Sequence, residues 1–289
     1  MEQTAKEKGK LYLVPTPIGN LEDMTFRAIN VLKSSDLILA EDTRHTLKLL
    51  NHFDIQTPME SFHEHNQRLK LESIIERITH GEMIALVSDA GMPVINDPGH
   101  PLVLACIQSD IDLVALPGPN AALTALVASG LSSDRFTYYG FFPRDNKSQA
   151  EVTALVGRNR ATAIFYESPH RVKKTLQAFS KQLDPDTPLV LARELTKKYE
   201  EYTRGSLNQV QKAIEDRTLK GEFVILVAGG HMKEDEADPA RDSHQDLGDW
   251  VRAVMDQENL SAKEAIKVVA KRSGHKRQAV YQAYHQLDQ

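Results

Sequence analysis

The chain has 289 residues, enough for two domains and a small appendage. Hydrophobic residues make up 41% and charged residues 26% of the chain, the balance of a soluble protein with a sizeable core. The formal net charge of -5 excludes nucleic-acid binding through overall positive charge, so any such contact must come from local basic patches. Cys106 is the only cysteine, which excludes an intramolecular disulfide and a multi-cysteine metal site.

The start of the chain, residues 1–10, is polar and has no apolar core typical of a signal peptide. No apolar run approaches the roughly 18–20 residues that cross a bilayer. We therefore expect a cytoplasmic protein without a membrane anchor.

Short apolar runs alternate with amphipathic stretches over most of the chain. We predict strands at residues 10–14, 36–40, 83–87, 112–116, 136–142, 162–166, 188–195, 199–205 and 222–228. Helical patterns fall between them, for example at residues 24–33, 43–53, 66–79 and 100–109. Such alternation predicts an α/β protein whose sheets are at least partly parallel.

The regular alternation changes near residue 120. Residues 199–205 are expected to pair antiparallel with a neighbour, which predicts a second α/β lobe with a mixed sheet. The stretch "KEDEADPARDSHQD", residues 233–246, is acidic and nearly without apolar residues, as expected of a solvated linker. The predicted organisation is an N-terminal α/β lobe at 1–122, a C-terminal α/β lobe at 123–231, an acidic linker at 232–246 and a basic helical domain at 247–289.

The last segment has the pattern of short helices. Ser261 and Glu264 form a predicted capping box, and Ser273-Gly274 separates two helical patterns that resemble a helix-turn-helix. Six Lys or Arg residues and one acid lie between Ser261 and His285. This basic tip favours a nucleic-acid contact, with a solvated helix face as the alternative.

Four loops rich in glycine, proline and polar residues follow predicted strands. They are "PTPIGN" (15–20), "EDTRH" (41–45), "SDAGMPVINDPG" (88–99) and "PGPNAA" (117–122). Open α/β sheets bind ligands at the carboxyl ends of their strands, and glycine and proline allow close, rigid approach of the backbone. No dinucleotide or phosphate-loop glycine motif is present, so a neutral or cationic ligand with an adenine face fits best.

Two aspartates of the third loop have different expected roles. Asp89 ends a strand and is expected to accept hydrogen bonds from an ammonium or hydroxyl group of a ligand. Asp97 precedes Pro98, and this pair is a common helix start. Helix capping is therefore the favoured role for Asp97, with ligand contact as the alternative.

Seven motifs occur in order: "LYLVPTPIGNLEDMT", "AEDTRHTLKLL", "SFHEHN", "LVSDAGMPVINDPG", "LPGPNAALTALVASGL", "IFYESPHRV" and "LARELTKKYEE". The chain thereby resembles the tetrapyrrole-methylase-like class of S-adenosylmethionine enzymes. Within that class it is similar to the bacterial enzymes that methylate the ribose 2'-oxygen of a cytidine in the decoding region of 16S ribosomal RNA. The resemblance covers about residues 10–229, and the basic helical tail is also similar to that family's end.

The resemblance implies a two-lobed tetrapyrrole-methylase-like fold with a small C-terminal all-α domain, and a homodimer that acts on 16S rRNA or the small ribosomal subunit. It implies S-adenosylmethionine as the cofactor, bound between the lobes, and neither a metal nor a membrane. The implied cofactor residues are Pro17, Ile18, Gly19, Asp89, Ala90, Gly91, Val94, Ile95, Asn120, Ala121, Phe165 and Tyr166. Many relatives have a small hydroxyl or thiol residue where this chain has Asn120, whose amide can still form hydrogen bonds. Strand alternation directs only one of Phe165 and Tyr166 toward the cleft.

The rate of methyl transfer to a ribose hydroxyl depends mainly on alignment of the reactants, and a base makes a smaller contribution to the rate enhancement. The candidate bases are Asp42, His63, Glu64, His65, Glu167 and Glu194. We favour Asp42 or His65, although a structural pairing of Asp42 with Arg44 is an alternative. The sequence His63-Glu64-His65-Asn66 lacks the ligand types and spacing of a zinc site.

RNA contacts are expected at basic side chains and one histidine in or next to these motifs, in "PRDNKS" (143–148) and in the tail. These are Arg44, His63, Arg144, Lys147, Arg171, Lys197, Lys276 and Arg277, with Lys173, Lys174 and Lys198 as further candidates. Phosphate contacts predict a steep salt dependence of substrate affinity. Two other functions stay open: a tetrapyrrole methyltransferase of the same fold, and an RNA-binding protein without catalysis, which would not bind S-adenosylmethionine.

Overall fold

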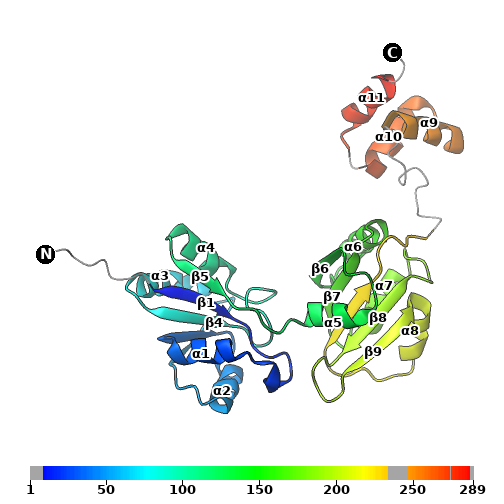
Figure 1. Ribbon diagram of the computed structural model, residues 1–289. Helices are drawn as coiled ribbons and strands as arrows, with labels where there is room; N and C mark the ends of the chain where they lie inside the picture. Colours follow the sequence, from blue (N-terminus) through cyan, green and yellow to red (C-terminus); the bar gives the residue numbers. More distant parts are fainter. Residues whose placement is uncertain (1–8, 234–246, 274, 287–289) are drawn as a thin grey trace. The chain divides into compact units, whose positions relative to one another are not determined.

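The computed structural model of the chain describes residues 9–233, 247–273 and 275–286. The chain divides into two compact units, Met1–His231 and Met232–Gln289 (Figure 1). Most of the predicted acidic linker, residues 234–246, lies outside the described residues. Among the described residues, no helix is both long enough and apolar enough to span a membrane.

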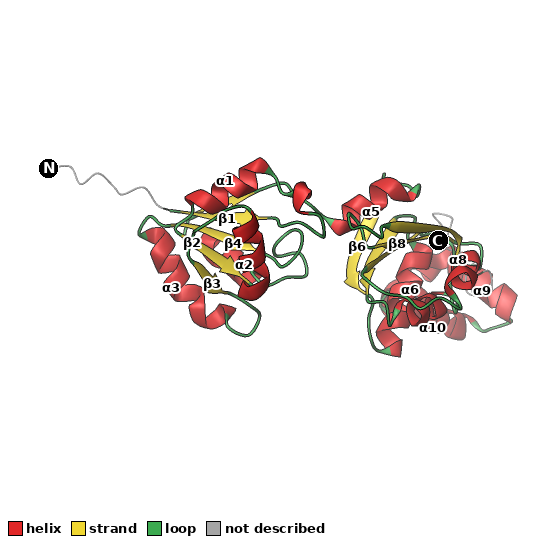
Figure 2. Ribbon diagram, turned by 90° about the horizontal axis from the view of Figure 1, so that it is seen from below, coloured by secondary structure: helices red, strands yellow, loops and turns green. Residues whose placement is uncertain are grey.

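The N-terminal lobe contains a five-stranded parallel sheet in the order β3-β2-β4-β1-β5. The strands are β1 (Lys10–Val14), β2 (Leu37–Ala40), β3 (Met59–Ser61), β4 (Met83–Val87) and β5 (Asp112–Ala115). The helices are η1 (Leu21–Asp23), α1 (Phe26–Ser34), α2 (Thr43–His52), α3 (Gln67–Thr79) and α4 (His100–Gln108). Figure 2 shows the strands in yellow with the helices packed against them. The predicted strands and helices of this lobe are present, with ends that shift by one or two residues, and β3 is an addition.

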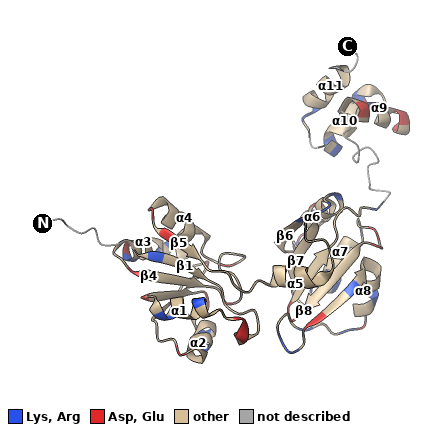
Figure 3. Cartoon of the chain, in the orientation of Figure 1, with Lys and Arg blue, Asp and Glu red and all other residues tan. Residues whose placement is uncertain are grey.

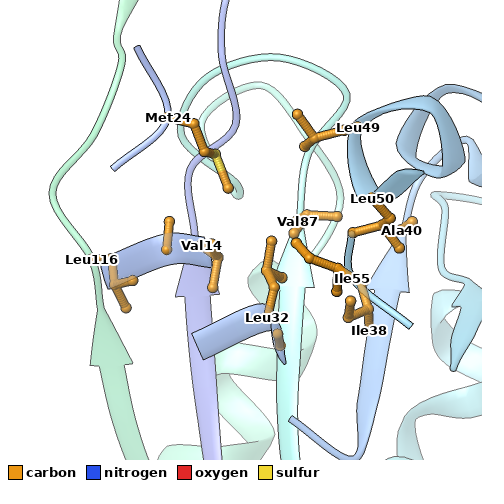
Figure 4. Packing of buried hydrophobic residues seen from close by; sticks show 12 residues of the cluster. Val14, Met24, Leu32, Ile38, Ala40, Leu49, Leu50, Ile55, Val87 and Leu116 are labelled. Atoms are coloured by element: carbon orange, nitrogen blue, oxygen red, sulfur yellow. The ribbon is translucent and has the colours of Figure 1, made fainter. Parts of the chain in front are cut away.

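Helices cover both faces of this sheet, which explains why its strands are continuous apolar runs. Ala85 and Val87 of β4 face a core formed with α1 and α2 (Figure 4). Ile84 and Leu86 face the opposite core, formed with α3 and α4. Cys106 of α4 belongs to that second core and is 0% exposed. Burial raises the pKa of its thiol to about 11.

The C-terminal lobe contains a mixed sheet in the order β6-β7-β10-β8-β9. The strands are β6 (Phe136–Phe141), β7 (Thr162–Glu167), β8 (Pro188–Arg193), β9 (Glu201–Ser206) and β10 (Phe223–Val227), and the helices are α5 (Ala121–Ser129), α6 (Asn146–Arg158), α7 (Val172–Phe179) and α8 (Leu207–Ile214). β6 is parallel to β7 and the other pairs are antiparallel, so the predicted antiparallel pairing of β9 is confirmed. Helix α5 packs on one face of the sheet, with Leu126 in a core that includes Val190 and Leu226.

The second unit consists of α9 (Leu247–Glu258), α10 (Ala262–Ser273) and α11 (Arg277–Gln286). Trp250, Ile266 and Val280 belong to its buried core. At the start of α10 the Ser261 backbone N–H donates to Glu264 Oε2 over 3.1 Å, which is one half of the predicted capping box. The predicted small all-α domain is therefore present.

Candidate functional site

The loops after β1, β4 and β5 are fastened to one another at the carboxyl edge of the parallel sheet. Thr16 and Gly91 exchange two backbone hydrogen bonds, each 3.0 Å long. The Ser88 hydroxyl donates to the Gly91 carbonyl over 2.8 Å, and the Thr16 hydroxyl donates to the Ser88 carbonyl over 3.0 Å. A Cβ atom at Gly118 would lie 2.6 Å from Pro15 Cβ, so the third loop needs a glycine there. These contacts make a rigid frame.

The loop at 88–99 carries backbone strain. Gly91, Val94 and Asn96 have φ values of 84°, 73° and 66°. Such a conformation is unfavourable for a β-branched residue, and each non-glycine example costs about 1–3 kcal/mol. Val94 packs its side chain against the core that holds α3 and α4. The surrounding frame thus holds this loop in a shape that its residues would not adopt alone.

A cavity of about 450 Å³ opens beside this loop, within the range of roughly 300–1,000 Å³ that small-molecule sites occupy. Segments of both α/β lobes form its walls. Of the predicted cofactor residues, the following line it: Ile18, Asp89, Ala90, Gly91, Ile95, Asn120, Ala121 and Tyr166. The Tyr166 hydroxyl accepts a hydrogen bond from the Ala122 N–H over 3.2 Å, and Asn120 Oδ1 caps α5 by accepting from the Leu123 N–H over 2.9 Å.

A second cavity, of about 280 Å³, adjoins the first and shares part of its wall. Pro17 and Gly19, two further predicted cofactor residues, line this one. Lys197 also lines it, and a Cβ atom at Gly19 would clash with the aliphatic part of the Lys197 side chain. The predicted cofactor residues are therefore divided between two neighbouring cavities.

Two predicted cofactor residues line neither cavity. Val94 is directed into the N-terminal core because its left-handed backbone turns the loop there. Phe165 is 0% exposed and stacks on Tyr139 at a centroid distance of 5.0 Å, on the face of β7 opposite to Tyr166. Phe165 is thus a core residue, and alternation along the strand directs Tyr166 alone to the cavity.

Asp97 does not cap the helix that follows it, so this expectation was wrong. The N-cap of α4 is Gly99, and the Asp97 side chain lines the first cavity. Burial, together with the neighbouring carboxylates of Glu41 and Asp89, raises the pKa of Asp97 to about 7. Burial and Asp89 also raise the pKa of Glu41, a residue of the "EDTRH" loop that the sequence did not single out.

Asp89 itself is held in place by the polypeptide backbone. Its Oδ1 accepts a hydrogen bond from the Asp42 N–H over 3.1 Å. It lines both cavities, as do Ile18 and Ala90. The Asp89 carboxylate therefore lies between the two cavities.

Asp42 is the N-cap of α2 and is paired with Arg44. Arg44 donates to the two Asp42 carboxylate oxygens over 3.0 and 2.7 Å, and its backbone N–H donates to Oδ1 over 2.9 Å. These hydrogen bonds hold the pKa of Asp42 far below its usual range. Asp42 is accordingly a weak base, and the structural pairing with Arg44 is the arrangement observed.

The histidines of "SFHEHN" lie outside both cavities. His65 is exposed, and its ring centroid is 6.0 Å from that of His63. His63 is half-buried, and no hydrogen-bond partner for its Nδ1 is found among the described residues. Among the residues that the structure describes, no group of three or more His, Cys, Asp or Glu side chains is arranged to hold a metal ion.

Glu167 has a structural environment. Its side chain is 0% exposed; it accepts hydrogen bonds from the Thr175 hydroxyl over 2.7 Å and from the Ser168 N–H over 2.9 Å. Arg171 lies 3.6 Å away and also donates to the carbonyls of Phe142 and Pro143. Arg171, a predicted RNA contact, therefore forms its observed interactions within the C-terminal lobe.

Replacing Glu167 with alanine is expected to lower the free energy of unfolding by about 2–3 kcal/mol, because Thr175 and Arg171 lose a buried acceptor. Urea denaturation measures this loss. Glu151→Ala, which removes an exposed partner of Lys147, should change stability by less than about 0.5 kcal/mol. Unchanged stability of Glu167→Ala combined with a lost reaction would restore a catalytic role for Glu167.

The other predicted RNA contacts differ in accessibility. Arg144, Lys147, Lys276 and Arg277 are exposed, and Lys147 lies 4.0 Å from Glu151. Arg44 is exposed but paired with Asp42. Lys197 Nζ donates to Glu194 Oε1 over 2.9 Å and to Glu222 Oε2 over 2.7 Å, so this ammonium is already balanced by two carboxylates.

Comparison with known proteins identifies similar chains. Residues 10–211 match the family model of the tetrapyrrole (corrin/porphyrin) methylases. A protein of Halalkalibacterium halodurans named ribosomal RNA small subunit methyltransferase I is 45% identical over 98% of this chain and 97% of its own length. A protein of the same name from Bacillus subtilis is 43% identical over 96% of this chain and 95% of its own length.

Solved structures show the same fold at low identity. A diphthine synthase is 14% identical with a TM-score of 0.59, and the match covers 78% of this chain and 92% of that one. A uroporphyrin-III C-methyltransferase from Thermus thermophilus, solved with S-adenosyl homocysteine, is 18% identical with a TM-score of 0.52, covering 75% of this chain and 97% of that one.

Proposed function

The chain belongs to the tetrapyrrole (corrin/porphyrin) methylase family of S-adenosylmethionine-dependent methyltransferases, and we propose that it methylates the RNA of the small ribosomal subunit. The position that we propose is the ribose 2'-oxygen of a cytidine in the decoding region of 16S rRNA. The observation that carries this proposal is the first cavity, whose walls combine most of the motif residues expected to hold the methyl donor. The names of relatives at 40–48% identity support the RNA substrate.

The first cavity fits S-adenosylmethionine chemically. Asp89 and Asp97 supply carboxylates suited to an ammonium or sulfonium, while Ile18, Ile95 and Tyr166 supply apolar and aromatic surface. When bound, S-adenosylmethionine supplies a methyl group whose bond to sulfur breaks, the electron pair staying on sulfur, as the substrate oxygen bonds to carbon and loses its proton.

The contribution of the chain itself is mainly alignment. Alignment of reactants is worth about 7–11 kcal/mol, whereas a base adds a factor of roughly 10²–10⁴. The frame of Thr16, Gly91 and Gly118 supplies the rigidity that alignment needs. The base would take the proton of the acceptor hydroxyl. Asp42 is a weak base, so a carboxylate on the cavity wall, such as that of Asp89, fits the role of the base better.

The exposed basic side chains of the second unit fit an RNA backbone. Lys263, Lys267 and Lys271 recur every four residues along α10, and Lys276 and Arg277 follow at the start of α11. Figure 3 shows the charged residues along the chain, with Lys and Arg in blue.

That the protein forms a homodimer remains a prediction.

Lys276→Ala combined with Arg277→Ala is expected to raise the KM for the small subunit about tenfold and to leave the affinity for S-adenosylmethionine unchanged. The reason is the loss of phosphate contacts, each of which also contributes about 0.7–0.9 to the slope of log affinity against log salt. Steady-state kinetics at several salt concentrations measure both quantities. An unchanged slope would remove these residues from the RNA interface.

The proposed function is tested by mapping ribose methylation in 16S rRNA from cells with and without the gene. A decoding-region cytidine that loses its 2'-O-methyl group without the gene, and regains it when purified protein acts on those subunits, is the expected result. An unchanged methylation pattern would contradict the proposal. Binding of S-adenosylmethionine to the purified protein separates the methyltransferases from a non-catalytic RNA-binding protein.

A further inference from the structure

The second cavity differs from the first in the charge of its walls. The first cavity is lined by the acids Asp89, Asp97 and Glu222, besides the fully buried Glu167, and by no Lys, Arg or His, which fits a cationic ligand. The second has His45, Lys48 and Lys197 in its walls, together with the acids Asp89 and Glu222. Glu194 and Glu222 already balance Lys197, so Lys48 and His45 are the cationic or ionisable groups that remain for an anion.

Both of these side chains are exposed and lie on helix α2, one turn apart or less. Within the described residues Lys48 has no ion-pair partner, in contrast to Arg44 on the same helix, which is paired with Asp42. A phosphate at the mouth of the cavity would meet Lys48 without first displacing a carboxylate.

Thr46, between these two residues in sequence, also lines the second cavity. It is 2% exposed, and its Oγ1 has no hydrogen-bond partner among the described residues. A buried hydroxyl is normally hydrogen-bonded, and it can donate and accept. The Thr46 hydroxyl is therefore suited to a polar group that enters the cavity.

The wall shared by the two cavities is where methyl transfer would have to occur. Ile18, Asp89, Ala90 and Glu222 line both cavities. A donor in the first cavity and an acceptor in the second would face each other across this wall. Asp89 would then lie beside the acceptor hydroxyl.

We propose that the second cavity binds the nucleotide that is methylated, with its ribose between Thr46 and Asp89 and its phosphate at Lys48 and His45. This inference rests on the proposed function, because it names the place of the RNA substrate within that site. It assigns Thr46, His45 and Lys48 to the acceptor side and leaves the methyl donor to the first cavity.

The test compares Lys48→Ala and Thr46→Val with the wild type, using small ribosomal subunits from cells that lack the gene. Lys48→Ala is expected to raise the KM for subunits about tenfold and to lower the salt slope by about 0.7–0.9, as expected for one phosphate contact. Thr46→Val is expected to raise the KM about threefold to tenfold, and Thr46→Ser should restore it. Both variants should bind S-adenosylmethionine as the wild type does in calorimetry.

Lys33→Ala is the matched control, because Lys33 is an exposed lysine of α1 that lines neither cavity. Its KM and salt slope should equal those of the wild type. Unchanged KM values for Lys48→Ala and Thr46→Val, with an active wild type, would overturn the inference and leave the proposed function intact. Weaker binding of S-adenosylmethionine by both variants would also overturn it, since these residues would then serve the donor. A wild type that transfers no methyl group would reject the proposed function and the inference with it.

Discussion

Replacing Asp89 with asparagine is expected to weaken binding of S-adenosylmethionine by a factor of about thirty or more. Asp89 presents its carboxylate to both cavities, and the Asp42 N–H fixes one of its oxygens. Asparagine keeps the size of the side chain but removes the negative charge that faces a cationic ligand. Loss of one partner of a desolvated charge pair costs about 2–5 kcal/mol, which corresponds to roughly thirtyfold to several-thousandfold in affinity.

Titration calorimetry with S-adenosylmethionine measures this effect directly. Asp112→Asn is a suitable control, because Asp112 is an exposed residue of β5 that pairs with Lys10 over 3.3 Å. Its affinity should match that of the wild type. An Asp89→Asn protein with wild-type affinity would show that the donor does not use this wall.

The affinity for S-adenosylmethionine is expected to rise with pH as Asp97 ionises, at a pKa of about 7 in the free protein. A cationic donor favours the ionised carboxylate, so binding should release a proton near neutral pH. The groups that act on Asp97 are Glu41 and Asp89, and Asp97 in turn influences Tyr138 and Tyr166.

Calorimetry in buffers of different ionisation enthalpy counts the protons released. Asp97→Asn should abolish most of the release and flatten the pH dependence between about pH 6 and 8. The same number of protons released by this variant would place the titrating group elsewhere.

The same shift has a consequence for the stability of the free protein. An acid whose folded-state pKa is raised binds its proton more tightly when folded, so this stabilisation is fully present below the unfolded pKa of about 4. It is lost as the pH rises through about 7. The wild type should therefore lose stability relative to Asp97→Asn between about pH 4 and 7, as followed by thermal unfolding.

Much of the fold could be predicted because the buried strands are continuous apolar runs. Met83–Val87 is buried on both faces of a parallel sheet, so its sequence has a strong local signal. Met59–Ser61 was missed because it is a three-residue edge strand, half-buried throughout. Its position depends on pairing with β2 and leaves no local pattern.

The site was predictable as far as loop position determines it. Loops that follow parallel strands must gather at one edge of the sheet, and ten of the twelve predicted cofactor residues line the two cavities. The direction of a side chain within a loop depends on dihedral angles that the sequence does not reveal. Val94 turns inward at a φ of 73°, and Gly99 takes the capping position that Asp97 was expected to fill.

Roles that depend on distant partners were also beyond the sequence. Glu167 and Arg171 were candidates because acids and bases near a motif suggest chemistry. Thr175 and the carbonyls of Phe142 and Pro143 engage them instead, and only the folded chain brings these groups together. Glu41, one of the acidic neighbours that raise the pKa of Asp97, comes from a separate loop, and only folding brings it beside Asp97.

The single thiol of Cys106 can report on the opening of one lobe alone. Because it is fully buried in the core beneath α4 and its pKa is raised, a thiol-specific reagent can modify it only when that core opens. The labelling rate therefore measures how often α4 detaches from the sheet, and it is insensitive to motions confined to α9–α11. Ligands that clamp the 88–99 loop, which leads directly into α4, should slow this labelling, so one native atom can record their arrival without any added probe.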